Sequence, residues 1–303
     1  MDLNVTFAGV HFKNPIVAAS GSFGFGREYG EFYDISALGG ICVKGLTLHP
    51  RAGNPPPRVA ESPMGMLNSV GLQNPGADAF IKEDLPYLRG FHTVVIANIS
   101  GDTAEEYAKL AERLSIAGVD IIEVNVSCPN VKEGGIQFGK SADSVAKVTE
   151  AVKAKARHVP VMVKLSPNVT DICEIAKAAE SAGADALSLI NTVLGMRIDT
   201  ATFKPVLHTN TGGLSGPAVF PIAVRMVWQV ASTVKIPILG MGGVSSGNDA
   251  VEMMLAGASL AGVGTACFTD PYAPLRIIDG LKEYMSRNFV YAVHELTGKV
   301  ISY

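Results

Sequence analysis

The stretch Val119-Asp120-Ile121-Ile122-Glu123-Val124 is a short and mainly apolar run of the kind that forms a buried β-strand. It passes directly into Asn125-Val126-Ser127-Cys128-Pro129-Asn130, where polar side chains and a proline end the strand. The segment 131–139 that follows is rich in glycine and is typical of a flexible loop able to fold over the thiol. A thiol between two amides at the end of a buried strand predicts an enzyme active site at a sheet edge.

Runs of the same kind recur along the chain and alternate with amphipathic segments of helical length. The predicted strands are Pro15–Ala19, Gly40–Lys44, Val94–Ile99, Ile121–Val126, Val161–Leu165, Ala186–Ile190, Ile236–Gly240 and Leu260–Gly264. The predicted helices are Thr103–Ala117, Ala142–Arg157, Asp171–Ala182, Ala218–Thr233, Ser246–Ala256 and Pro274–Arg287. The expected N-caps are Asp102 or Thr103, Ser141, Thr170, and Ser245 or Ser246.

Eight apolar strands that alternate with helices predict an α/β fold of one type, the closed parallel (β/α)8 or TIM barrel. A doubly wound sheet is the alternative, but nothing in the pattern marks a topological switch point. Residues 4–12 alternate like a hairpin and are expected to cap the bottom of the barrel. Residues 46–85 and 194–216 are rich in Gly with Pro or Thr and are expected to be loop insertions at the C-terminal face. No linker interrupts the pattern, so residues 1–303 are expected to form a single domain.

The composition excludes several classes of protein. Hydrophobic residues make up 48% of the chain and charged residues 17%, which allows a large core and argues against disorder. The net charge of -3 gives no basic surface for nucleic acid. No apolar run approaches the ~20 residues of a membrane span, and the N-terminus does not resemble a signal peptide. A cytoplasmic protein without membrane contact is therefore expected.

The four cysteines are widely spaced and follow no zinc or iron–sulfur pattern, so no metal site is expected. Three of them, Cys42, Cys173 and Cys267, lie in apolar patterns and are predicted to be small buried hydrophobic residues. Cys128 alone has polar neighbours.

Chemistry in barrels of this kind sits at the carboxyl ends of the strands. Those positions hold Ser20, Lys44, Asn98, Asn125, Cys128, Lys164, Asn191, Thr192, Gly242, Gly243, Gly264 and Thr265, with no carboxylate among them. A lone lysine there is usually a solvated charge, and a lone asparagine or glycine usually forms a turn. Turns alone do not account for the whole set at eight strand ends.

The glycines after the last two strands indicate the class of cofactor. Gly242-Gly243 and Gly264-Thr265 follow the seventh and eighth strands, where barrels hold a phosphate on backbone N–H groups. No G-x-G-x-x-G follows a strand, which favours a mononucleotide over a dinucleotide. FMN fits, because amides can hydrogen-bond its ring edge and a lysine can neutralise the anionic reduced flavin; the thiol then suggests proton abstraction coupled to hydride transfer. Pyridoxal phosphate also fits a phosphate loop and a lysine.

Three motifs taken together carry a family resemblance: Asn125-Val126-Ser127-Cys128-Pro129-Asn130, Asn68-Ser69-Val70-Gly71-Leu72-Gln73-Asn74-Pro75, and Gly242-Gly243 with Gly264-Thr265. The combination resembles the dihydroorotate dehydrogenases, flavoenzymes of pyrimidine synthesis that oxidise dihydroorotate to orotate. The likeness covers essentially the whole chain and implies an FMN-containing α/β barrel.

The branch within the family can be inferred in the same way. Cys128 resembles the soluble branches, which use Cys as the base where the membrane-associated, quinone-reducing branch uses Ser, and the extra N-terminal helical segment of that branch is not found. The segments 24–28, 195–199 and 211–217 look like those of the NAD-linked type and differ from the fumarate-reducing homodimers. Asn210 departs from the family pattern, in which Lys precedes the Thr-Gly-Gly stretch, and the difference concerns one loop contact.

The NAD-linked type implies partners. Its catalytic chain forms a homodimer core and associates with an electron-transfer subunit that holds FAD and a [2Fe–2S] cluster. This chain has neither cluster-spaced cysteines nor a nicotinamide fingerprint, so the electrons are expected to leave through another protein.

The resemblance also implies residue roles. Cys128 removes a proton from C5 of dihydroorotate while hydride passes from C6 to flavin N5, and turnover should rise with pH because an ordinary thiol has a pKa near ~8.5. Lys44 should contact both flavin and substrate, and Lys164 should lie near the flavin N1/C2 carbonyl, where reduction places negative charge. The implied substrate residues are Lys44, Asn68, Ser69, Val70, Gly71, Leu72, Asn125, Asn191 and Thr192. The implied FMN residues are Ser20, Lys44, Gly45, Asn98, Asn125, Lys164, Ile190, Gly216, Gly242, Gly243, Gly264 and Thr265.

Other functions stay open at this point. A fumarate-linked dihydroorotate dehydrogenase and an FMN barrel that reduces dihydropyrimidines or dihydrouridine share most of these features, although a tRNA reductase should carry a basic surface. A non-redox barrel would use Lys44 or Lys164 as a Schiff base. A non-catalytic flavin carrier would leave Cys128 and the strand-end amides without a task.

Overall fold

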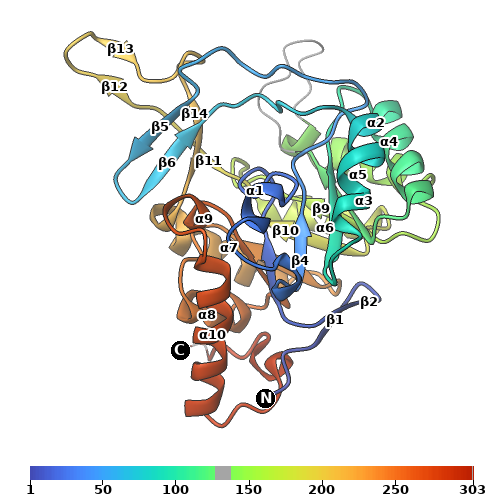
Figure 1. The fold of residues 1–303 in the computed structure, drawn as a ribbon, viewed down its shortest axis with the longest axis vertical. Coiled ribbons are helices and arrows are strands. Elements are labelled where there is room, and N and C mark those ends of the chain that lie inside the picture. Colours follow the sequence, from blue (N-terminus) through green and yellow to red (C-terminus); the bar gives the residue numbers. More distant parts are fainter. Residues whose placement is uncertain (127–137, 302) are drawn as a thin grey trace.

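Eight parallel strands close into a barrel (Figure 1). The computed structural model describes residues 1–126, 138–301 and 303. The barrel strands are β3 (Ile16–Ala18), β4 (Gly40–Cys42), β7 (Val94–Ile99), β8 (Ile121–Asn125), β9 (Val161–Lys164), β10 (Ala186–Leu189), β15 (Ile238–Met241) and β16 (Leu260–Val263). They follow one another around the barrel in chain order, and β16 pairs with β3. The predicted (β/α)8 barrel is confirmed.

Strand β8 illustrates how the sequence divides the barrel into an outer and an inner layer. Ile122 and Val124 belong to the core cluster that the helices cover, whereas Ile121 belongs to the cluster inside the barrel. Because side chains alternate along a strand, Glu123 and Asn125 face the interior with Ile121. The interior therefore changes from apolar at the bottom to polar toward the carboxyl ends.

The parallel register brings polar interior residues from neighbouring strands to the same height. Glu123 pairs with Asn98 of β7, and Asn125 pairs with Lys164 of β9. Lys164 pairs in turn with Ser188 of β10. Five interior polar residues on four adjacent strands thus gather toward the barrel mouth.

Helices cover the outside of the barrel. The long ones are α4 (Ala104–Ala117), α5 (Ala142–Lys153), α6 (Ile172–Ser181), α7 (Phe220–Ala231), α8 (Gly247–Leu255) and α10 (Ala273–Arg287). Shorter elements are α1 (Arg27–Gly30), α2 (Ala77–Ala79), the π-helical turn η2 (Phe80–Asp84), α3 (Leu85–Leu88), α9 (Ala266–Thr269), and the 3-10 turns η1 (Ile35–Ala37), η3 (Phe138–Lys140), η4 (Pro217–Val219) and η5 (Val293–Leu296). Within the described part of the chain, none of the helices combines the length and the apolar character that a membrane crossing requires.

The helix boundaries follow the capping chemistry of the sequence. Thr103, Ser141 and Ser246 are N-caps, and each side-chain oxygen accepts a hydrogen bond from a backbone N–H in the first turn. The prediction of Thr170 as an N-cap is wrong. Asp171 takes that position because its carboxylate, one residue further on, accepts from the Cys173 N–H.

The predicted N-terminal hairpin closes the bottom of the barrel. Strands β1 (Val5–Phe7) and β2 (Val10–Phe12) pair antiparallel. Phe7 and Phe12 are fully buried and meet edge to face, with ring centroids 6.0 Å apart. Both belong to the inner core cluster with Val17 and Ile96 of the barrel strands. The hairpin therefore seals the apolar end of the barrel and leaves the polar end open.

The two insertions contain regular structure, so the expectation of loops is wrong in part. Strands β5 (Val59–Ser62) and β6 (Gly65–Asn68) of the first insertion join β11 (Val193–Gly195) and β14 (Gly212–Ser215) of the second in an antiparallel sheet of order β11-β14-β6-β5. The short strands β12 (Ile198–Asp199) and β13 (Lys204–Pro205) form a further pair. Figure 1 shows the four-stranded sheet on the opposite side of the barrel from the β1–β2 hairpin. Local patterns do not show the whole sheet because its central pair, β6 with β14, joins Asn68 of the first insertion to Gly213 of the second.

Candidate active site

A cavity of about 420 Å³ opens at the carboxyl ends of the barrel strands. Most of the residues predicted for a cofactor or substrate site line it together. They are Ser20, Lys44, Gly45, Asn68, Val70, Gly71, Leu72, Asn98, Asn125, Lys164, Ile190, Asn191, Thr192, Gly242, Gly243, Gly264 and Thr265. The barrel thus gathers into one site residues that are spread over most of the chain.

Three predicted residues do not belong to this lining as described. Ser69 is buried beside it, with 2% of its surface exposed. Gly216 lies behind Gly243, since a Cβ at residue 243 would come within 2.7 Å of the Gly216 carbonyl oxygen. Cys128, the predicted base, lies outside the described residues.

The lining also includes residues that sequence reasoning missed. Met66 of β6 and Leu214 and Ser215 of β14 come from the four-stranded sheet, which lies over the cavity. Further missed residues are Ala19, Gly21, Ser22, Met241 and Phe268. Those near strand ends could have been found from the barrel rule, whereas the sheet residues carry no local signal.

One wall of the cavity is a chain of amides. The Asn191 side chain donates to the Asn125 side-chain oxygen at 3.2 Å, and its own oxygen accepts from the Thr192 N–H at 2.8 Å. The Tyr107 hydroxyl donates to the Asn125 backbone carbonyl at 2.7 Å, which fixes the end of β8 from helix α4. These contacts fix amide groups at the cavity wall, and amides can both donate and accept hydrogen bonds.

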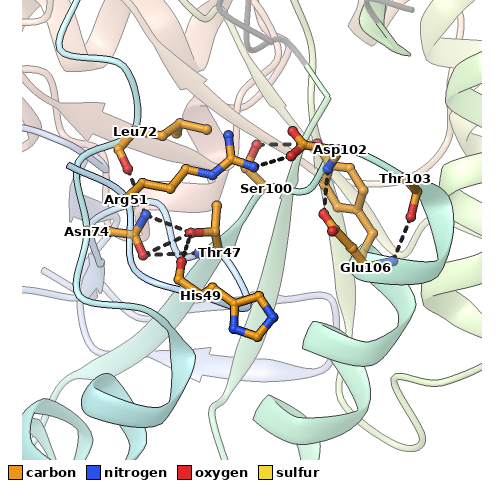
Figure 2. A network of polar contacts seen from close by, with 10 residues as sticks. Thr47, His49, Arg51, Leu72, Asn74, Ser100, Asp102, Thr103 and Glu106 are labelled. Carbon is orange, nitrogen blue, oxygen red and sulfur yellow. Dashed lines mark hydrogen bonds and ion pairs between the residues drawn. The ribbon is translucent and has the colours of Figure 1, made fainter. Parts of the chain in front are cut away.

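A second wall is the turn at Gly71 and Leu72, which a buried asparagine holds in place (Figure 2). Both turn residues have positive φ, 78° and 56°. The Asn74 amide donates to the Leu72 carbonyl at 2.7 Å and to the Thr47 hydroxyl at 2.9 Å. Its oxygen accepts from the Thr47 and Gly76 N–H groups at 3.2 and 2.9 Å. All of the amide's capacity is used, so the turn is fixed to the strand-end segment after β4.

The same insertion is tied by an ion pair to the segment after β7, the strand next to β4 in the barrel. Arg51 contacts the Asp102 carboxylate at 2.5 Å, as Figure 2 shows. The Asp102 N–H donates to Glu106 at 2.7 Å in the first turn of α4. The first insertion is thereby fixed at both the Thr47 and the Arg51 positions.

Glycines after β15 form the end of the cavity nearest α7. Gly242 and Gly243 have φ values of 126° and 82°, a region that favours glycine. A Cβ at residue 243 would also come within 3.0 Å of the Phe220 backbone nitrogen, at the start of α7. The packing there therefore admits only glycine.

A buried carboxylate below the cavity is the largest departure from the sequence-based picture. Glu123 is fully buried, and its carboxylate lies 3.7 Å from the Lys164 ammonium. It accepts hydrogen bonds from the Ser188 hydroxyl at 2.7 Å, from the Cys42 thiol at 3.1 Å and from the Asn98 amide. Cys42 is therefore a hydrogen-bond donor as well as a small buried residue.

The electrostatics of this cluster favour one charge state. Burial alone would raise the pKa of Glu123, but Lys164 and the three hydrogen-bond donors hold that pKa below its usual value. Burial raises the pKa of the Cys42 thiol well above its ordinary range, and the neighbouring Glu123 charge adds to this effect. Next to Lys164 the structure thus places a buried carboxylate and a neutral thiol.

Comparison with known proteins identifies the family. The family model described as dihydroorotate dehydrogenase matches residues 2–285. A relative from Alkaliphilus oremlandii is 54% identical over 299 residues, which cover 99% of each chain, and is named dihydroorotate dehydrogenase B (NAD(+)), catalytic subunit. Relatives with the same name from Thermoanaerobacter pseudethanolicus and Geotalea uraniireducens are 54% and 51% identical, again over 99% of each chain. The chain therefore belongs to the dihydroorotate dehydrogenase family.

Proposed function

We propose that this protein oxidises dihydroorotate to orotate in pyrimidine synthesis, with FMN bound in the barrel cavity and NAD+ as the final electron acceptor. The observation that carries the proposal is the gathering of both lysines, the amide wall and the strand-end glycines around one cavity. The names of relatives more than half identical over nearly the full length support the same reaction. We further propose that residues 1–303 act as one FMN-binding domain.

The residues of the cavity fit FMN. The Asn98 side chain is fully buried and donates to Glu123, while its Oδ1 atom has no hydrogen-bond partner among the described residues. A buried acceptor without a partner at a cavity wall is costly unless a ligand N–H satisfies it. Backbone N–H groups around Gly243 would suit a phosphate group, and Lys164 would supply a cation to the flavin ring. When bound, FMN supplies the hydride acceptor of the reaction.

The chain's own residues would do the rest of the chemistry. We assign to Cys128 the removal of the proton at C5 of dihydroorotate. Lys44 would contact both ligands, and Lys164 would stabilise the negative charge that reduction places near the C2 carbonyl. The substrate's ring amides and carboxylate would be held by Asn68, Asn125, Asn191 and Thr192, and by N–H groups of the segment 69–72. We assign Ser20, Gly45, Ile190, Gly216, Gly242, Gly264 and Thr265, with Gly243 and Asn98, to FMN.

We also propose the assembly that the names of the relatives suggest. "Catalytic subunit" in those names denotes a protein that works with another chain. For this chain we propose a homodimer core flanked by electron-transfer subunits that hold FAD and a [2Fe–2S] cluster. The cytoplasmic location expected from the sequence stays a prediction.

The experiment that tests the function is anaerobic mixing of the purified, FMN-loaded chain with dihydroorotate. Bleaching of the oxidised flavin bands, with orotate as the product, is the expected result. A yellow protein that stays oxidised would refute the substrate and keep the flavin. A colourless chain that cannot take up added FMN would refute the flavin assignment itself.

Gly264→Leu is expected to block FMN binding without disturbing the fold. A Cβ at residue 264 would meet nothing closer than 3.7 Å, and the residue lines the cavity, so a larger side chain has room only in the space for the cofactor. The FMN dissociation constant, measured by flavin fluorescence, should rise at least tenfold, which corresponds to about 1.4 kcal/mol. Unfolding of the two apoproteins should coincide, and an unchanged affinity would place the cofactor elsewhere.

Asn74→Asp is expected to weaken substrate binding while FMN binding stays unchanged. A carboxylate keeps the hydrogen bonds accepted from Thr47 and Gly76 but cannot donate to the Leu72 carbonyl, so the turn at residues 71–72 loses its anchor. KM for dihydroorotate should rise roughly three- to tenfold, the effect of one net hydrogen bond. Asn288→Asp, which removes a similar amide-to-carbonyl bond at the C-cap of α10, is the control and should leave KM unchanged. An equal loss in both variants would contradict the assignment.

A further inference from the structure

Glu123 itself has no assigned role in the proposed reaction. Glu123 is fully buried and is absent from the residues that line the cavity. Substrate cannot reach its carboxylate, so it cannot act as a general acid or base on the substrate. A buried charge of this kind lowers the stability of the folded protein unless it is paired.

The contacts of Glu123 hold its carboxylate next to Lys164. The Lys164 side chain is only 6% exposed, and its ammonium lies 3.7 Å from the Glu123 carboxylate and 3.2 Å from the Ser20 hydroxyl. Glu123 is held by Ser188, Asn98 and Cys42, each from a different barrel strand. The carboxylate is thus fixed on three sides and offers its charge to the ammonium group.

The other groups around the pair do not replace this charge. The Cys42 thiol is neutral, because burial and Glu123 raise its pKa well above the ordinary range. Ser20 and Ser188 are uncharged, and Lys44, which lines the same cavity, is a second cation. Among the groups described, Glu123 supplies the negative charge next to Lys164.

We propose that Glu123 is a positioning residue, whose carboxylate keeps Lys164 in place as an ammonium ion before electrons reach the flavin. This inference rests on the proposed function, because it requires FMN in the cavity. A cation already present when the flavin is oxidised offsets the negative charge of the reduced ring without any further proton movement. Electrostatic preorganisation of this kind costs no rearrangement at the moment of reaction.

The proton balance makes the inference measurable. With Lys164 charged throughout, two electrons and one proton convert bound FMN into its anionic reduced form, the proton going to N5. With the Glu123 charge removed, a buried ammonium lacks compensation, and Lys164 lies as a neutral amine while the flavin is oxidised. Two electrons then bring in two protons, one to N5 and one to the Lys164 amine. The electrons come from an electrode in the experiment and from dihydroorotate in turnover.

The test is the pH dependence of the flavin midpoint potential, measured spectroelectrochemically on FMN-loaded protein. The wild-type slope should correspond to one proton per two electrons. Glu123→Gln keeps the size of the side chain and one acceptor oxygen, and its new NH2 group can donate to the Ser188 hydroxyl. This variant should double that slope, and its potential should return to the wild-type value at the acid end. Lys164→Met should keep the wild-type slope at a lower potential, because it has no amine to protonate.

Two control variants separate charge from packing. Ser188→Ala removes one hydrogen bond to Glu123 but leaves the ion pair, and Glu123→Asp retains the charge; both should keep the wild-type slope. A wild-type slope of two protons per two electrons overturns the inference without any variant, and so does an unchanged slope in FMN-loaded Glu123→Gln. A wild-type protein that dihydroorotate cannot reduce refutes the proposed function instead, since the electrode measurement needs no substrate.

Discussion

Cys128→Ala is expected to retain FMN and to lose reduction of the flavin by dihydroorotate, with the rate falling about 10²- to 10⁴-fold. Hydride transfer from C6 leaves a proton at C5 that a base must accept, and Cys128 follows Asn125 of the amide wall by three residues in the sequence. Stopped-flow measurement of flavin bleaching under anaerobic conditions gives the rate directly. The wild-type rate should rise with pH as the thiol ionises, and the residual rate of the variant should not.

The matched control for this prediction is Cys173→Ala. Cys173 is a half-buried free cysteine on α6, and it does not line the cavity. Its removal should leave the bleaching rate and the pH profile unchanged. If Cys128→Ala reduced the flavin within a few-fold of the wild-type rate, another group would have to take the proton.

Lys164→Met is expected to destabilise the apoprotein by about 3–5 kcal/mol at neutral pH. The substitution removes the cation beside Glu123 and leaves a fully buried carboxylate with hydrogen bonds but no counter-charge. Urea unfolding of the FMN-free proteins measures the difference. The apoprotein is the correct species, because FMN binding adds its own stabilisation to the folded state.

The destabilisation should depend on pH with a definite sign. In the folded wild type the pKa of Glu123 lies below the usual value of about 4.3, although burial acts to raise it. Such a group contributes stability that is fully present above the unfolded pKa and is lost as pH falls through the folded one. Without Lys164, burial has less to oppose it, and the folded pKa of Glu123 rises. The gap between wild type and variant should therefore be widest at neutral pH and should narrow in acid.

Lys153→Met provides the comparison for this effect. Lys153 pairs with Asp185 at 2.6 Å, but both side chains are about one-third exposed. Water already solvates such a pair, and its loss should cost about 0–1 kcal/mol. Equal destabilisation in the two variants would show that burial does not increase the contribution of the Glu123–Lys164 pair to the free energy of unfolding.

The sequence predicted the barrel and most of the cavity because both depend on local features. Each barrel strand is a short apolar run, and the site lies where those runs end, so Lys44, Asn98 and Lys164 could be located without a structure. Helix starts such as Thr103 follow the same local rule. Agreement of this kind is expected wherever neighbouring residues alone decide the outcome.

The remainder could not be predicted because it depends on the register of distant strands. Glu123 is one charged residue in an apolar run, and only the closed barrel places it between Asn98, Lys164 and Ser188. The Asn74 network likewise links a turn to the segment after β4. These contacts arise from pairing across the fold, for which the sequence carries no periodic signal.

The four-stranded sheet over the cavity has a consequence for engineering. Strand β6 pairs with β5 from its own insertion and with β14 from the other, so each insertion supplies an edge that the other covers. A recipient barrel grafted with one insertion alone would carry an unpaired strand edge, which invites aggregation. The two insertions therefore form one structural unit although they are separated in the sequence. Recombination between related barrels should succeed only at crossover points that keep both insertions from the same parent.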